Sequence, residues 1–121
     1  MSIPIRLIIL LAILSPFTQL VAHAGDSTIA YTRFVDGGTE IWLIEDDGAN
    51  NVRVGSGSGA SWSPDGKRLA FVQDVDGNSD IYFMDEDGSN VTRLTTDSAG
   101  EHSPTWSPDG SMIAFNSNRS G

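Results

Sequence analysis

The sequence contains no cysteine, which excludes both a disulfide framework and a thiolate metal site. Histidine is almost as scarce, because only His23 and His102 are present. The predicted mature chain keeps only His102, so it cannot assemble a multi-histidine metal site, and we expect no Ser-His-Asp triad within these residues. No G-x-S-x-G nucleophile elbow occurs either. We therefore expect a protein that is not an enzyme, with no catalytic, cofactor-binding or metal-ligating residues and no cofactor.

Basic residues are also few. Seven Lys and Arg stand against sixteen Asp and Glu, which gives a formal net charge of −9. A nucleic-acid partner requires a basic patch that neutralises phosphates, so this charge balance argues against one. It favours a secreted β protein whose acidic turns keep it soluble.

No apolar run is long enough to cross a membrane. Leu7–Leu14 is the main unbroken run, and a spanning helix needs about 20 residues. Arg6 precedes it and Ala22–Ala24 reads as an A-x-A cleavage site, so residues 1–24 are interpreted as a secretory signal peptide. The mature chain would begin near Gly25, without a membrane span and without a lipoprotein cysteine, in the periplasm or outside the cell. An uncleaved anchor extended through Phe17–Val21 is the alternative.

Helical periodicity is missing too, since no segment repeats apolar residues every 3.6 positions over the roughly ten residues that a helix needs. The chain shows instead an internal repeat, W-S-P-D-G, at Trp62–Gly66 and again at Trp106–Gly110. The two tryptophans lie 44 positions apart, which is the length of one propeller blade. The repeat therefore predicts stacked blades of short strands.

A shift of 40 positions aligns the rest of the chain with itself. Ile29–Tyr31 falls on Leu69–Phe71, and Glu40–Trp42 falls on Asp80–Tyr82. A third copy begins at Ile113, and all six Asp-Gly pairs occupy equivalent positions. Asp-Gly between two strand-like runs is a strong hairpin signal, so these pairs predict the turns of each blade.

Two segments, Asp80–Thr95 and Pro104–Gly121, resemble the TolB-type β-propeller repeat, a WD-repeat-like family of periplasmic and secreted bacterial proteins. The resemblance covers nearly all of the chain after residue 27. It implies an all-β, partial β-propeller over residues 25–121, with about two four-stranded antiparallel blades and the start of a third. It also implies protein–protein interaction at the bacterial cell envelope, with a protein partner of unknown identity.

The sequence departs from TolB itself in one respect, and the resemblance leaves two other classes of propeller protein open. TolB carries a separate α/β domain between its signal peptide and its propeller, whereas the repeats here begin soon after the predicted cleavage site. We therefore expect a TolB-like propeller protein rather than the TolB component. Similar repeats also form the propellers of prolyl-oligopeptidase-like peptidases and of lyases acting on acidic sugars, whose catalytic residues would lie beyond this chain.

The repeat predicts an incomplete ring, because propellers close with about four to eight blades. We accordingly expect a fragment or a truncated gene product, with a sheet stack that self-associates as the alternative. Gly55–Gly59 is expected to be a flexible link between blades. Nine strands are expected, at residues 29–34, 40–45, 51–54, 61–62, 68–73, 80–85, 91–94, 105–106 and 112–116.

The strands should share an apolar seam. Because side chains alternate along a strand, Ile81 and Phe83 are expected on one side and Met84 on the other. Trp62 and Trp106 should pack between blades rather than form a platform for a ligand. The most buried residues should include Ala70, Phe71, Ile81, Phe83, Leu94 and Trp106.

Two loops carry weak motifs that we interpret as structural. Gly55–Ala60 matches G-x-G-x-x-A, but a dinucleotide site would need a helix to follow, and a strand end at Trp62 follows instead. Asp74–Asp80 places oxygen atoms at alternate positions, as calcium loops do, yet the glycine and glutamate of an EF-hand are missing. We expect polar turns there and at Asp85–Asp87.

Overall fold

The structure is a computed structural model that describes residues 19–22 and 28–120. Those residues form ten strands and no helix. The strands are β1 Gln19–Ala22, β2 Thr28–Val35, β3 Gly38–Glu45, β4 Val52–Ser56, β5 Ser58–Trp62, β6 Arg68–Val75, β7 Asn78–Asp85, β8 Thr92–Arg93, β9 Glu101–Trp106 and β10 Ile113–Ser117.

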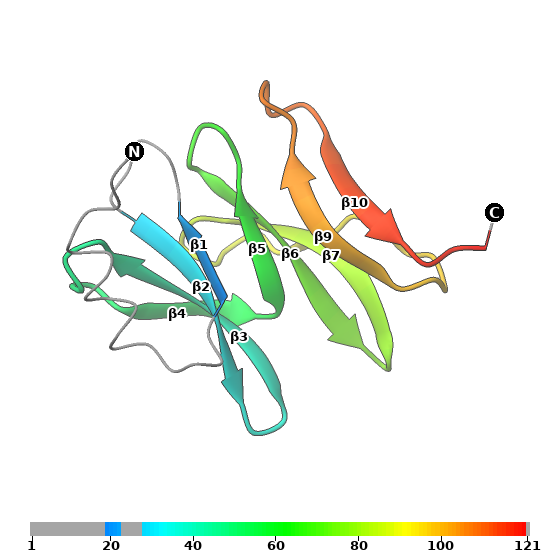
Figure 1. The fold of residues 1–121 in the computed structure, drawn as a ribbon, viewed down its shortest axis with the longest axis horizontal. Coiled ribbons are helices and arrows are strands. Elements are labelled where there is room, and N and C mark those ends of the chain that lie inside the picture. The colour runs from blue at the N-terminus through cyan, green and yellow to red at the C-terminus, as the bar shows by residue number, and fades with distance from the viewer. Residues whose placement is uncertain (1–18, 23–27, 121) are drawn as a thin grey trace.

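The strands make three separate antiparallel sheets (Figure 1). Two sheets have four strands each, in the orders β1-β2-β3-β4 and β5-β6-β7-β8, and the third contains β9 and β10. Strands thus pair in sequence order, as hairpin-connected blades require. The prediction of an all-β, partial propeller with two four-stranded blades and the start of a third is confirmed.

The Asp-Gly pairs close the hairpins, as the sequence indicates. Gly37 turns β2 into β3 with φ +93°, and Asp76 and Gly77 turn β6 into β7 with φ of +54° and +82°. Glycine and aspartate tolerate this left-handed region, which β-branched residues avoid. Both hairpins are in register over their whole length, so each blade has a pair of long central strands.

The W-S-P-D-G repeat closes the turns between β5 and β6 and between β9 and β10. In the first, Ser63 Oγ donates to Asp65 Oδ1 at 2.7 Å, and the Gly66 amide donates to the Ser63 carbonyl at 2.9 Å. Ser107 Oγ and Asp109 Oδ1 lie 2.6 Å apart in the second. The repeated letters therefore encode one hydrogen-bonded turn used twice.

The main core lies between the two four-stranded sheets. The first sheet contributes Ala30, Ile41 and Leu43, and the second contributes Ala60, Leu69, Phe71 and Met84. Each sheet alone has a small apolar face, so the two must stack to bury it. Trp62, which is half-buried, packs against this cluster, and so it lies between blades as predicted.

The alternation along β7 is also as predicted. Met84 is fully buried in the core toward the first sheet, whereas Ile81 and Phe83 together face the pocket beside β9 and β10. Adjacent blades therefore use opposite faces of the same strand.

Three burial predictions need correction. Ala70, Phe71 and Ile81 are fully buried, but Phe83 and Trp106 are only half-buried, and Leu94 is 44% exposed. All three line a pocket against the third sheet, which has two strands among the described residues instead of four. Their exposure follows from the narrower cover on that side.

The expected flexible link at Gly55–Gly59 is wrong. β4 continues to Ser56, β5 begins at Ser58, and only Gly57 lies between them. Its φ of +132° is available to glycine, and a Cβ there would meet the Val72 carbonyl oxygen at 2.6 Å. The glycine thus permits a tight corner that connects two blades.

The strand count is ten rather than nine, because Gln19–Ala22 pairs with β2 as β1. These residues belong to the predicted signal peptide, so the pairing describes the uncleaved chain. The domain boundary at residue 24 lies among residues that the structure does not describe and stays a prediction. Within the described residues, no helix has the length and apolar character to cross a membrane.

Candidate functional site

Three turns of the second and third sheets surround a surface groove of about 660 Å³. The turns after β5 and β9 are the two W-S-P-D-G turns, and both lie at the upper rim in Figure 1, opposite the β2–β3 and β6–β7 hairpins. The third turn, which follows β7, begins at Asp85. The lining consists of Ser63, Pro64, Asp65, Lys67, Arg68, Asp85, Glu86, Asp87, Trp106, Asp109 and Gly110. We call this site the rim groove.

The two W-S-P-D-G aspartates are held ionised by their own turns. Hydrogen bonds from Ser107 and Ser111 lower the pKa of Asp109 from 3.8 to about 2. In the same way, Ser63 and then the Lys67 amide lower the pKa of Asp65. Because hydrogen bonds to the ionised carboxylate are stronger than those to the neutral carboxyl, both groups give the groove negative charge at neutral pH.

The turn after β7 adds three further carboxylates to the groove. Asp87 accepts from the Ser89 side chain and amide, which lowers its pKa. Asp85 accepts from Asn90 at 2.7 Å and lies 3.7 Å from Arg68. Glu86 is exposed on this turn. Five carboxylates thus face Lys67 and Arg68, so the groove is acidic overall.

Trp106 forms the wall where the second and third sheets meet. Its indole Nε1 donates to the Ser61 carbonyl oxygen of the neighbouring sheet at 3.1 Å. The prediction that this tryptophan packs between blades is confirmed. Because the indole nitrogen is used in this contact, the side chain lines the rim groove without offering a free N–H to a ligand.

A carboxylate–arginine pair recurs at one position of each four-stranded sheet. In the second sheet the fully buried Asp80 accepts from Arg93 Nη2 at 2.6 Å. In the first, Glu40 accepts from Arg53 Nε at 2.7 Å, and hydrogen bonds from Trp42 and then Arg53 lower its pKa. Each pair joins a central strand to the outer strand beside it, so these groups are structural.

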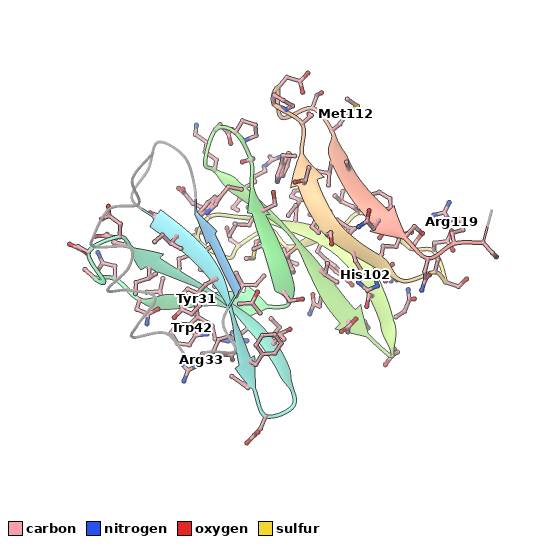
Figure 2. All side chains as sticks on the ribbon, viewed as in Figure 1. Tyr31, Arg33, Trp42, His102, Met112 and Arg119 are labelled. Atoms are coloured by element: carbon pink, nitrogen blue, oxygen red, sulfur yellow. The ribbon has the colours of Figure 1, made fainter. Side chains whose placement is uncertain are left out.

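The third sheet holds a different pair that sequence analysis missed. Buried Glu101 in β9 accepts from Ser117 at 3.1 Å and from Arg119, which is labelled in Figure 2, at 3.2 Å. The W-S-P-D-G alignment places Gly57 and Val75 at these positions one repeat earlier. Two uncharged residues of the earlier repeat thus correspond to an acidic and a basic residue in the later one. This joint change is the signal in the sequence that could have revealed the pair.

The loops with weak motifs have ordinary structural roles. Gly55–Ala60 runs through β4 and β5, and no helix follows it, so the geometry of a dinucleotide site is not present there. In Asp74–Asp80, Ser79 donates to Asp74, and Asp80 is turned inward to Arg93. His102, which is labelled in Figure 2, is exposed on β9. Across the described residues, no group of three or more His, Asp or Glu is placed to hold a metal ion.

The arrangement of the sheets first identifies the class of fold. Antiparallel sheets of hairpin-connected strands stack face to face, and the same turn recurs on one rim, so the sheets are blades of a β-propeller. The family model of the TolB beta propeller domain matches residues 12–121. The chain belongs to the TolB β-propeller family.

Solved TolB structures are similar to this chain over most of its length. TolB from Acinetobacter baumannii matches with a TM-score of 0.67 and 33% identity, over 78% of this chain and 25% of that one. A TolB from Agrobacterium tumefaciens matches with a TM-score of 0.69 and 34% identity, over 77% of this chain and 35% of that one. The chain therefore spans between a quarter and about a third of these relatives.

Peptidase propellers share the fold alone. An acylaminoacyl peptidase from Pyrococcus horikoshii matches with a TM-score of 0.59 at 18% identity, over 78% of this chain and 16% of that one. No curated protein sequence matches the chain significantly.

Proposed function

We propose that this protein is a periplasmic or secreted propeller scaffold that binds another protein at the bacterial cell envelope, with the rim groove as its docking surface. One observation carries the proposal: the groove exists only where successive blades meet, and its charge is fixed by turns that the repeat encodes. The identity of about one third to bacterial TolB propellers and the signal-like first 24 residues support the envelope setting.

The chemistry of the groove suits a protein partner better than a small molecule. Small-molecule sites are mostly apolar and enclose most of their ligand. The rim groove is open and lined largely by charged turn residues, with Trp106 as its one large aromatic side chain. Complementary charge across such a surface guides a partner and sets its orientation. We infer that the partner presents Lys or Arg side chains to Glu86 and its neighbours.

Site-specific photocrosslinking tests the proposal. A photoreactive amino acid at Glu86 should give a discrete adduct with one envelope protein in living cells of the bacterium that encodes this chain. Asp46 is the matched control, because it lies at the equivalent turn one repeat earlier and outside the groove. The same adducts from both positions, or none from Glu86, would argue against docking at the groove.

The likeness to peptidase propellers favours a second candidate, a propeller that serves an attached hydrolase. The protein purified from its native cells distinguishes the two. A peptidase activity that co-purifies with the chain and reacts with a serine-directed probe supports the second candidate. A preparation that captures its partner and carries no such activity supports the scaffold.

A further inference from the structure

The Asp-Gly pairs of the chain differ in how their reactive groups are held. Aspartate before glycine is especially prone to form a succinimide, because glycine has no Cβ to hinder attack by its amide nitrogen on the aspartate Cγ. All six aspartates are exposed, so exposure does not separate them. The pairs begin at Asp36, Asp47, Asp65, Asp76, Asp87 and Asp109.

Four of the pairs have both reacting groups in hydrogen bonds. Their glycine amides each donate to the backbone carbonyl oxygen three residues earlier, at 2.9 Å. Their aspartates each accept through Oδ1 from the amide two positions on, at 2.8, 3.1, 2.9 and 3.0 Å. Ring closure would break both bonds, because the nitrogen must lose its proton and the carboxyl must turn toward it. These pairs begin at Asp47, Asp65, Asp87 and Asp109.

Three of these four turns also disfavour the neutral carboxyl, which is the form that reacts. A carboxylate is a poor electrophile, whereas the neutral form can expel its hydroxyl as water. Serine hydroxyls are the main cause, and they lower the pKa of Asp109 from 3.8 to about 2 and the pKa values of Asp65 and Asp87 as well. These three aspartates are therefore protected in two ways.

The pairs at the tips of two hairpins have neither kind of hydrogen bond. Asp36-Gly37 and Asp76-Gly77 form the two-residue loops of the β2–β3 and β6–β7 hairpins, which point away from the rim groove in Figure 1. Within the part of the chain that the structure describes, neither carboxylate accepts a hydrogen bond and neither glycine amide donates one. Both reacting groups can thus approach each other without breaking a contact.

We propose that Asp36 and Asp76 are sites of isoaspartate formation in the folded protein. At Asp76, the Gly77 nitrogen forms a bond to Cγ, and the amide proton leaves with the carboxyl hydroxyl as water. Water then opens the cyclic imide at either carbonyl, which restores aspartate or leaves isoaspartate. No oxidant or cofactor takes part, and Asp36 reacts with the Gly37 nitrogen in the same way.

Isoaspartate changes the backbone of these hairpins. The chain then runs through Cβ and Cγ, which adds one methylene to the loop, and the former backbone carbonyl becomes a free carboxylate. The ladder is paired up to the loop itself, where Val75 stands opposite Asn78. Conversion at Asp76 should therefore loosen this last pair, and hydrogen exchange should become faster at its amides.

Incubation of the full chain in water enriched in heavy oxygen tests the proposal. Each passage through the imide places one heavy oxygen atom in the residue, and electron-transfer fragmentation distinguishes isoaspartate from aspartate. In the folded chain, Asp36 and Asp76 should gain label at least tenfold faster than the other four aspartates. In urea, where the turns are lost, all six should react at similar rates.

Asp76→Glu is the matched variant. It keeps the charge, but the longer side chain closes an imide far more slowly, so label at this position should disappear while Asp36 is unchanged. Persistent label in the variant, similar rates at all six pairs in the folded chain, or no label at Asp36 and Asp76 would overturn the proposal. A difference that persists in urea would also overturn it, because sequence neighbours rather than the fold would then set the rates.

Discussion

At the scale of single residues, the W-S-P-D-G turns show how a short motif fixes charge. In the second turn Ser107 Oγ and the Ser111 side chain donate to Asp109 Oδ1 at 2.6 and 2.7 Å. These bonds are stronger to the ionised carboxylate than to the neutral carboxyl, so they favour the charged form. The depressed pKa contributes stability that is present above about 3.8 and is lost as pH falls toward about 2.

Removing both hydroxyls should therefore raise the pKa of Asp109. In a Ser107→Ala, Ser111→Ala double variant, the pKa should move from about 2 toward 3.8, as followed by the carboxyl carbon in an NMR titration. Ser63→Ala is the control, because Ser63 bonds only Asp65 among these carboxylates and should leave Asp109 unchanged. An unaltered pKa in the double variant would show that the hydroxyls do not hold the charge.

The two carboxylate–arginine pairs test whether burial of the carboxylate sets how much each ion pair contributes to stability. Arg93 and Arg53 are similarly exposed, at 41% and 45%, but their partners Asp80 and Glu40 differ, at 0% and 22%. Arg93→Ala leaves the buried Asp80 carboxylate without its cationic partner, and it should lower the free energy of unfolding in urea by about 3 kcal/mol. Arg53→Ala should cost about 1 kcal/mol or less. Equal losses would mean that burial of the carboxylate does not set the cost.

Trp106 is half-buried, so its truncation should cost less than that of a core tryptophan. Trp106→Ala should lower the free energy of unfolding by about 2 kcal/mol, against about 3–5 for a fully buried ring. Trp106→Phe keeps most of the packing and loses the hydrogen bond to Ser61, so it should cost about 1 kcal/mol. A loss from Trp106→Ala that is too small to measure would show that the ring does not join the two blades.

At the scale of elements, repetition made the strands predictable. The Asp-Gly pairs give the β2–β3 and β6–β7 hairpins and the alternation of Ile81 and Met84, because these depend on local turn chemistry and a period of two. The partial exposure of Leu94 was not predictable in this way. It depends on how many strands the neighbouring sheet contributes, which is a property of the third blade and not of the segment itself.

The rim groove was beyond sequence analysis for a related reason. Its lining comes from three turns that are distant in the sequence and meet only when two blades stack. Each turn alone reads as a polar loop, and the carboxylates are recognisable as one surface only in three dimensions. The glycine-rich corner was misread because Gly, which usually signals flexibility, here permits a fixed positive φ.

The corner between β4 and β5 gives a test at this scale. Gly57→Ala imposes a strained φ of +132° and a contact of 2.6 Å with the Val72 carbonyl oxygen. Strain and overpacking together should cost about 2–4 kcal/mol in thermal or urea unfolding. Gly59→Ala has φ +62° and open space around the added methyl group, so it should cost about 1 kcal/mol. Similar costs would show that the corner yields to the added methyl group.

At the scale of the whole molecule, the stacking of the blades both stabilises the fold and forms the groove on which the proposed function depends. The contacts that bury Leu69 and Phe71 bring the first two blades together, and Trp106 ties the third blade to the second. The second contact also brings the acidic turns to one rim. The proposed docking surface is therefore a product of blade packing rather than a separate addition to the fold.

Charge reversal in the rim groove tests this account most directly. With the envelope protein captured at Glu86, titration of the purified pair should show that Glu86→Lys raises the Kd at least tenfold and flattens its dependence on salt. Asp46→Lys makes the same change of charge at the equivalent turn of the first blade and should leave the Kd within twofold. Equal effects of the two variants, or none from Glu86→Lys, would contradict docking at the rim groove.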